Sequence, residues 1–135
     1  MAYSELIKGR IFIGGVEEAA QAVEAGAANI VYDVRVNGHD EKPAYDYVQV
    51  SILDEARAET IQQGAQQIKA AYEAGKNIYI HCGSGNGRAS VMGAAVLQEL
   101  GMTSSLQQAI EQIKEAHPTA NIRPEMQQAL QTIYK

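Results

Sequence analysis

The feature that most constrains the fold is the segment 77–100, in which a short apolar run, a glycine-rich connection and a longer apolar stretch follow one another. Residues 77–80 (NIYI) are typical of a short buried strand, and residues 89–100 (ASVMGAAVLQEL) are apolar nearly all round. A helix without a polar face must be covered on all sides. The segment therefore predicts a strand that leads through a loop into a central buried helix, which Gly101 ends.

The rest of the chain alternates in the same way between short β-rich runs and stretches of helical periodicity. Further strands are predicted at 10–15, 29–35 and 47–52. Further helices are predicted at 16–26, at 60–75, around Leu106–Ile113 and from Pro124 onward. Ser104 and Gln107 form a possible capping box for the third of these helices. Such alternation indicates an α/β fold with a central, mostly parallel sheet of four to five strands flanked by helices.

Composition limits the classes of protein that fit. With 135 residues, 46% of them hydrophobic and 20% charged, the chain is expected to form a single domain over residues 1–135. A net charge of -5 disfavours binding to nucleic acid or to an anionic membrane. The single cysteine and the absence of a signal-peptide pattern favour a cytoplasmic protein. No Cys/His spacing resembles a metal site, so no metal is expected.

The connection 81–88 (HCGSGNGR) has the chemistry of an anion-binding loop. Between a strand and the start of a helix, backbone N–H groups can turn inward at the positive end of the helix. The glycines at positions 83, 85 and 87 allow the positive φ angles that such a nest requires. Arg88 adds a planar guanidinium that binds two phosphate oxygens, and the same positive field favours the nucleophilic thiolate of Cys82. The loop therefore predicts attack by Cys82 on a bound phosphate or a similar oxyanion.

The same residues match the His-Cys-x5-Arg signature of the protein tyrosine phosphatases. Nearly the whole chain resembles the small dual-specificity phosphatases: residues 9–35 resemble their opening strand–helix–strand unit, 47–55 (YVQVSILDE) their segment with the catalytic aspartate, and 103–130 their closing helices. The resemblance implies the cysteine-phosphatase fold. It also implies hydrolysis of phosphomonoesters without a cofactor, with phosphotyrosine, and phosphoserine or phosphothreonine, on proteins as the expected substrates.

By the resemblance, each site residue takes a role. Cys82 would form a phosphocysteine intermediate, Arg88 would bind the phosphate, and His81 would orient the loop and favour the thiolate. Asp54 would protonate the leaving group and then activate water. The remaining phosphate-binding residues would be Gly83, Ser84, Gly85, Asn86 and Gly87. Competitors for the role of Asp54 are Asp33, Asp40, Asp46 and Glu55.

The sequence departs from the family pattern after the arginine. Relatives commonly carry Ser or Thr there, and its hydroxyl assists the departure of the sulfur, whereas this chain has Ala89 followed by Ser90. The loop also lacks the lysines that favour inositol lipids, so protein substrates are expected instead. Whether Arg35, Lys42 and Arg57 are solvated or line the mouth of the pocket stays open at this stage.

Two other functions remain in play. A rhodanese-like sulfurtransferase also uses a cysteine in an anion-binding loop, and residues 32–35 (YDVR) resemble that family. A catalytically impaired phosphate-binding module is the second, because of Ala89. A dinucleotide loop does not fit, since residues 103–110 lack the acidic residue that it needs. His39 and His117 are isolated and are expected to have surface or capping roles. The natural substrate, the pathway and the oligomeric state cannot be derived from the sequence.

Overall fold

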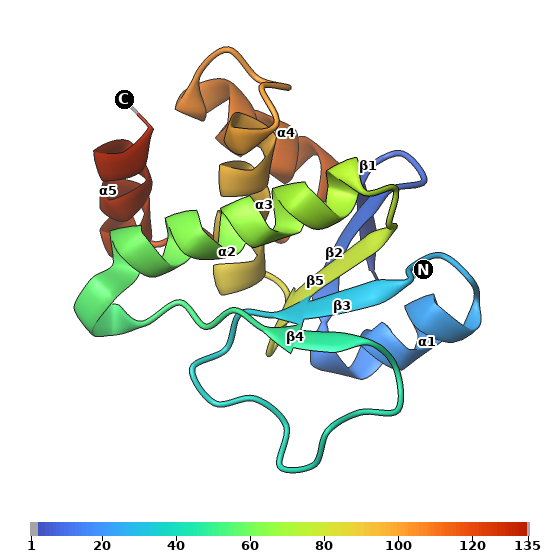
Figure 1. The fold of residues 1–135 in the computed structure, drawn as a ribbon. Helices are drawn as coiled ribbons and strands as arrows, with labels where there is room; N and C mark the ends of the chain where they lie inside the picture. Colours follow the sequence, from blue (N-terminus) through green and yellow to red (C-terminus); the bar gives the residue numbers. More distant parts are fainter. Residues whose placement is uncertain (1–2, 135) are drawn as a thin grey trace.

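The computed structural model describes residues 3–134 and contains one five-stranded sheet between two layers of helices (Figure 1). The strands are β1 (Ser4–Ile7), β2 (Ile11–Gly15), β3 (Ile30–Asp33), β4 (Tyr47–Gln49) and β5 (Ile78–Cys82), in the spatial order β1-β2-β5-β3-β4. The edge strand β1 runs antiparallel to β2, and the other neighbours pair in parallel. The predicted α/β fold with a mostly parallel sheet is confirmed.

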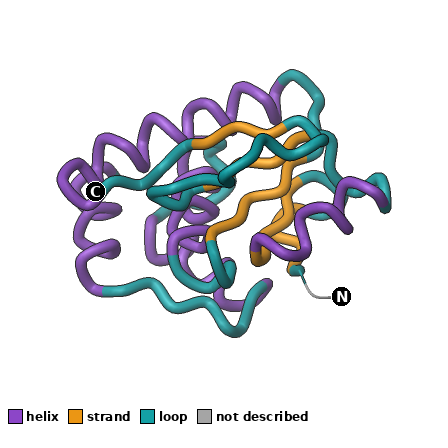
Figure 2. Tube along the Cα trace, turned by 90° about the horizontal axis from the view of Figure 1, so that it is seen from below, coloured by secondary structure: helices purple, strands orange, loops and turns teal. Residues whose placement is uncertain are grey.

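Helices cover both faces of the sheet. They are α1 (Ala19–Glu24), α2 (Arg57–Glu73), α3 (Arg88–Glu99), α4 (Leu106–Ala116) and α5 (Pro124–Ile133), with 3-10 turns at Val16–Glu18 and Asp54–Ala56. Figure 2 shows α1 and the long helix α2 on opposite sides of the strands. Two separate apolar clusters follow from this arrangement, a small one under α1 and a large one between the sheet and the other four helices. No helix within residues 3–134 is both long and apolar enough to cross a membrane.

Helix α3 lies at the centre of the larger cluster. Every residue from Ala89 to Leu97 is buried, as its apolar sequence predicts. Gly93 allows this helix to pack closely, because a Cβ atom there would lie 2.7 Å from Ile13 Cδ1 on β2 and 2.9 Å from Ile113 Cδ1 on α4. Since α3 begins at Arg88, directly after the glycine-rich loop, the packing of α3 also determines where that loop lies.

Some local predictions were wrong in their details. The strand β1 was not predicted, because it is a short edge strand whose four residues carry little apolar pattern. The capping pair of α4 is displaced by one residue: the hydroxyl of Ser105 accepts a hydrogen bond from the Gln108 backbone N–H, and the Gln108 side chain accepts one from the backbone N–H of Ser104. The helix predicted over 16–26 starts as a 3-10 turn, so that α1 begins only at Ala19.

The close packing at Gly93 predicts a cost for a single methyl group. Gly93→Ala should lower the free energy of unfolding by about 1–3 kcal/mol, because overpacking against three core side chains outweighs the gain in helix propensity. The matched control is Gly64→Ala on α2, where the flexible end of Met92 is the nearest obstacle, and its effect should stay under about 1 kcal/mol. Urea denaturation of both variants measures the difference, and equal effects would contradict this account of α3.

Candidate active site

Three carbonyl groups of the loop between β5 and α3 are held by hydrogen bonds from other parts of the fold or from the start of α3. The Gly83 carbonyl accepts from Val16 N at 3.1 Å, and the Asn86 carbonyl accepts from Asn121 N at 2.6 Å. The Gly85 carbonyl accepts from Ser90 Oγ at 3.3 Å. Of the N–H groups in the same peptide units, that of Asn86 donates to Ser84 Oγ at 3.2 Å, and those of Ser84 and Gly87 are left to bind an anion. The geometry therefore favours the anion-binding loop that the sequence predicts.

Gly85 is the one loop residue whose backbone requires glycine. Its φ is +86°, and a Cβ atom would collide with the backbone of Gly14 on β2. The expectation of positive φ was wrong for the other two glycines: Gly83 does not have it, and Gly87 has φ -102°. The loop thus turns at Gly85 and lies directly against the end of the neighbouring strand.

The predicted nucleophile and arginine lie at the two ends of this loop. Cys82 ends β5, is 5% exposed, and its Sγ accepts from the Gly85 N–H at 3.2 Å. Arg88 begins α3 and donates through Nη1 to the Ile52 carbonyl at 3.2 Å and through Nη2 to Asp54 Oδ1 at 3.1 Å. This holds the guanidinium at the mouth of the loop, in the position where it can reach a bound phosphate.

These groups open into one pocket of about 610 Å³. Of the residues predicted for the site, Cys82, Gly83, Ser84, Gly87, Arg88 and Asp54 line it. Gly85 and Asn86 form the back of the loop and do not line the pocket, and the His81 ring is completely buried behind it. The structure therefore brings the predicted nucleophile, arginine and acid together, and assigns the other three positions to support of the loop.

Asp54 is the candidate acid that the fold delivers to the pocket. It begins the 3-10 turn before α2, its side chain is 59% exposed, and its Oδ1 lies 3.5 Å from Arg57 Nε. The competing acids do not line the pocket: Asp40, Asp46 and Glu55 are exposed, and Asp33 is buried at the end of β3. Glu125, at the start of α5, lines the pocket and was not considered from the sequence.

Asp33 is the centre of a buried polar cluster behind the loop. Its carboxylate accepts from the Arg35 guanidinium at 2.8 Å and from the Tyr47 hydroxyl at 2.5 Å. Burial alone would raise the pKa of Asp33, but these hydrogen bonds outweigh it, and the pKa is lowered. For Tyr47, burial and the hydrogen bond to Asp33 raise the pKa to about 12. The cluster therefore holds an ionised carboxylate beside the loop at neutral pH.

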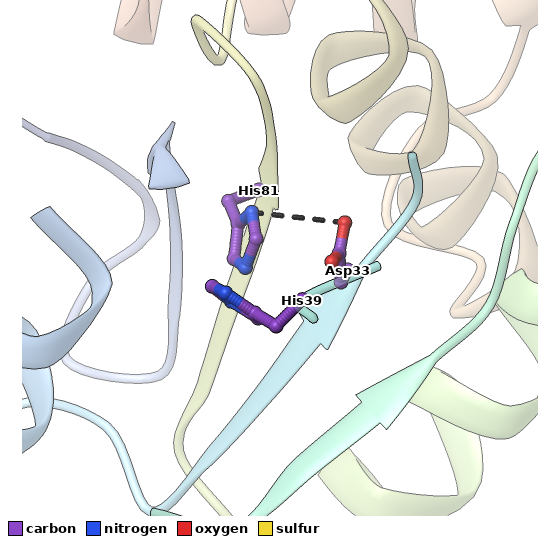
Figure 3. Close-up of side chains that lie close together, drawn as sticks. All are labelled: Asp33, His39 and His81. Carbon is purple, nitrogen blue, oxygen red and sulfur yellow. Dashed lines mark ion pairs between the residues drawn. The ribbon is translucent and has the colours of Figure 1, made fainter. Parts of the chain in front are cut away.

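His81 connects this cluster to the loop (Figure 3). Its Nδ1 lies 3.1 Å from the Cys82 carbonyl oxygen and 3.8 Å from Asp33 Oδ1. Burial lowers the pKa of His81 despite the attraction of Asp33, so the ring is neutral at pH 7. A carbonyl can only accept, so Nδ1 carries the proton and donates to Cys82. His81 thus positions the backbone of the cysteine rather than placing a positive charge beside its sulfur.

The cluster also gathers three side chains that could in principle ligate a metal ion. Asp33, His39 and His81 each offer an atom within 4.8 Å of the others, although their spacing in the sequence gives no sign of it. The oxygens of Asp33 are already occupied by Arg35 and Tyr47, and the positive charge of Arg35 disfavours a cation. The residues present fit a hydrogen-bonded cluster better than a metal centre.

His117 supports the loop from the opposite side. It is 7% exposed, so the expected surface role was wrong, whereas the capping role is confirmed: His117 is the C-cap residue of α4, and its backbone N–H donates to the Ile113 carbonyl at 2.8 Å. Its Nε2 lies 3.0 Å from Asn86 Oδ1, and Thr119 donates to the same oxygen at 2.7 Å. Burial lowers the pKa of His117. Neither contact could be found from the sequence, because 31 positions separate His117 from Asn86 and the intervening helices have to be placed first.

Solved structures with the same fold are known. Human DUSP28 aligns with a TM-score of 0.82 at 19% sequence identity, over 98% of this chain and 93% of that chain. PTPMT1 aligns with a TM-score of 0.80 at 19% identity, over 97% of this chain and 92% of that chain.

A leucine-rich-repeat and phosphatase-domain protein from Entamoeba histolytica gives a TM-score of 0.79 at 16% identity, over 98% of this chain and 90% of that chain. This chain has the fold of the small dual-specificity phosphatases. No protein-family model and no curated protein sequence matches it. In the dual-specificity-phosphatase fold of this chain, the loop, Cys82 and Arg88 stand at the carboxyl end of a central parallel strand, where α/β folds place their ligands.

The buried carboxylate predicts a pH-dependent contribution to stability. At pH 7, Asp33→Asn should lower the free energy of unfolding by about 1.5–3 kcal/mol, the range for hydrogen bonds to a charged group. Because the folded pKa of Asp33 is lowered, its contribution is present above the unfolded pKa of about 3.9 and is lost as pH falls through the folded value.

Denaturation between pH 7 and pH 3 should therefore show the gap between wild type and Asp33→Asn narrowing toward the acid end. Asp40→Asn, at an exposed position of the loop after β3, is the matched control and should show no such gap. A gap that stays constant over this range would mean that the charge of Asp33 does not contribute.

Proposed function

We propose that this chain is a phosphatase that hydrolyses phosphomonoesters through a phosphocysteine intermediate on Cys82. The observation that carries the proposal is the placement of Cys82, Arg88 and Asp54 in one pocket, around a loop whose backbone is held by hydrogen bonds through three of its carbonyl groups. Support comes from the fold, since the solved structures that share it include dual-specificity phosphatases. The assignment of a phosphatase fold does not depend on which phosphomonoester the chain hydrolyses.

In this proposal, substrate phosphate takes the place that Asp54 now occupies on Arg88 Nη2. The loop N–H groups and the Arg88 guanidinium bind the non-bridging oxygens, and Cys82 Sγ attacks phosphorus as the bond to the leaving oxygen breaks. Asp54, released from Arg88 and protonated from solvent, gives this proton to that oxygen. It then takes a proton from the water that attacks the phosphocysteine, which frees phosphate and regenerates the thiolate.

The second chemical step lacks one source of assistance. Among the described residues, the Gly85 N–H is the one donor to Cys82 Sγ, Ala89 is completely buried, and the Ser90 hydroxyl donates to the Gly85 carbonyl. No hydroxyl therefore stabilises the departing sulfur in this arrangement. We expect attack on the substrate to be unimpaired and hydrolysis of the phosphocysteine to be the slow step.

Phosphotyrosine, and phosphoserine or phosphothreonine, on proteins stay the substrates predicted from the sequence. A soluble aryl phosphate is the first substrate to assay, because its hydrolysis does not require the recognition of a protein substrate. Sulfur transfer from thiosulfate is the competing activity to measure beside it, since the rhodanese-like alternative also uses a cysteine in an anion-binding loop. A chain that turns over neither would be a phosphate-binding module.

The proposed mechanism predicts separate phenotypes for the nucleophile and the acid. Cys82→Ser should abolish hydrolysis of p-nitrophenyl phosphate, because the serine hydroxyl is not ionised at neutral pH, yet tungstate should still raise the melting temperature by binding to the intact loop. Steady-state rates and thermal denaturation measure the two effects. Residual turnover near the wild-type rate would exclude Cys82 as the nucleophile.

The same assay with a poorer leaving group examines Asp54. Asp54→Asn should lower kcat by roughly 10²-fold or more for phenyl phosphate and much less for p-nitrophenyl phosphate, whose leaving group needs no proton. Asp46→Asn, at an exposed position outside the pocket, is the matched control. Equal losses on both substrates would transfer the role of acid to another group, with Glu125 as the nearest candidate in the pocket.

A further inference from the structure

The lining of the pocket carries more positive than negative charge, because arginines outnumber the two acids that line it, Asp54 and Glu125. The sequence contains five arginines, and four of them line this pocket: Arg35, Arg57, Arg88 and Arg123. None of the lysines that the structure describes lines it. In a chain of net charge -5, this concentration of guanidinium groups in one cavity is a specific feature, and it identifies the pocket as a site for anions.

Three helices also begin at this pocket. Arg88 is the first residue of α3, Arg57 is the first residue of α2, and Arg123 precedes the first turn of α5. In Figure 1 the first turn of α2 lies next to the beginning of α5, in keeping with the packing of these two helices. The positive ends of three helix dipoles therefore add to the guanidinium charges around the same cavity.

One phosphate does not satisfy all of these donors. The loop N–H groups and Arg88 suffice for the non-bridging oxygens of the phosphate that reacts. Of the remaining arginines, Arg35 is held by Asp33, and Arg57 Nε is shielded from solvent without a hydrogen-bond partner, although it lies 3.5 Å from Asp54 Oδ1. Within the described part of the chain, the Arg123 guanidinium has no ion pair and no side-chain hydrogen bond. The guanidinium groups of Arg57 and Arg123 therefore have hydrogen-bond donors left for a second anionic group.

The walls of the pocket fit a small polar substrate better than an aromatic one. No Tyr, Phe or His of the described residues lines the cavity, and its apolar lining consists of Val36, Val91 and Met126. A phosphotyrosine ring would find no aromatic partner for stacking there. A volume of about 610 Å³ lies within the range of small-molecule sites and exceeds what a single phosphate needs.

We infer that Arg57 and Arg123, with Arg35 at the rim, form a second anion subsite. The preferred substrates are then small bisphosphates, in which one phosphate reacts at Cys82 while the other binds the second subsite. A phosphate suits this subsite better than a carboxylate, because a phosphomonoester offers three acceptor oxygens and about −1.5 to −2 charges at pH 7, whereas a carboxylate offers two oxygens and one charge. The inference rests on the proposed phosphatase activity for its kinetic part and on the pocket alone for its binding part.

The test compares a soluble inositol bisphosphate with p-nitrophenyl phosphate as substrates. Arg123→Gln should lower the ratio of kcat/KM for the bisphosphate to kcat/KM for the monophosphate by about tenfold or more, as expected for lost hydrogen bonds to a charged group. Arg10→Gln is the matched control, because Arg10 lies outside the pocket over the ring of Tyr72, and the ratio should not change. An unchanged ratio in Arg123→Gln would overturn the inference.

A binding measurement separates this inference from the proposed function. In Cys82→Ser, calorimetry should show that the inositol bisphosphate binds more tightly than inorganic phosphate, and that Arg123→Gln in the same background removes most of the difference. Equal affinities would exclude the second subsite whether or not the wild type is active. A doubly phosphorylated peptide serves as a further ligand: if the Arg123-dependent preference appears with the peptide and not with the small bisphosphate, the assignment of the substrate class is wrong.

Discussion

The hydrogen bonding that holds the backbone between Cys82 and Arg88 is the constraint on which the rest of this site depends. Val16, Ser90 and Asn121 donate to the carbonyl groups of Gly83, Gly85 and Asn86. Each bond comes from a different part of the fold, namely the turn after β2, the first turn of α3 and the segment before α5. The backbone of the loop is therefore fixed without a bound ligand, and such preorganisation is what stabilisation of a charged transition state requires.

The buried polar residues around the loop help to hold its backbone in place. His81 is neutral and donates to the Cys82 carbonyl, Asp33 stays ionised under Arg35 and Tyr47, and His117 holds the side chain of Asn86. Positive charge is concentrated instead on the open side, in arginines at the starts of α2, α3 and α5. This separation accounts for an acidic chain with an anion-binding pocket, because the net charge describes the whole surface and not the cavity.

The sequence predicted the features that local pattern determines. The apolar helix after Arg88, the strand before Cys82 and the turn of the loop at a glycine each follow from a few neighbouring residues. Asp33 was named only as a competitor of Asp54, and its role behind the loop follows from the register of β3 with β5, in which it pairs with His81. The positions of Arg123 and His117 could not be predicted, since both depend on how α4 and α5 pack against the sheet. The backbone dihedral angles of the loop could not be predicted either, since Gly87 has φ -102° where a positive φ was expected.

The central claim is that Cys82 carries the phosphoryl group during turnover, and trapping that intermediate tests it most directly. A rapid chemical quench after mixing with p-nitrophenyl phosphate, followed by digestion and mass spectrometry, locates the phosphoryl group. The account predicts phosphocysteine at Cys82 that approaches one equivalent per chain before the steady state, because no hydroxyl among the described residues assists the departing sulfur. It also predicts that Ala89→Ser lowers this level. Release of nitrophenol with no phosphocysteine at any time would contradict the account.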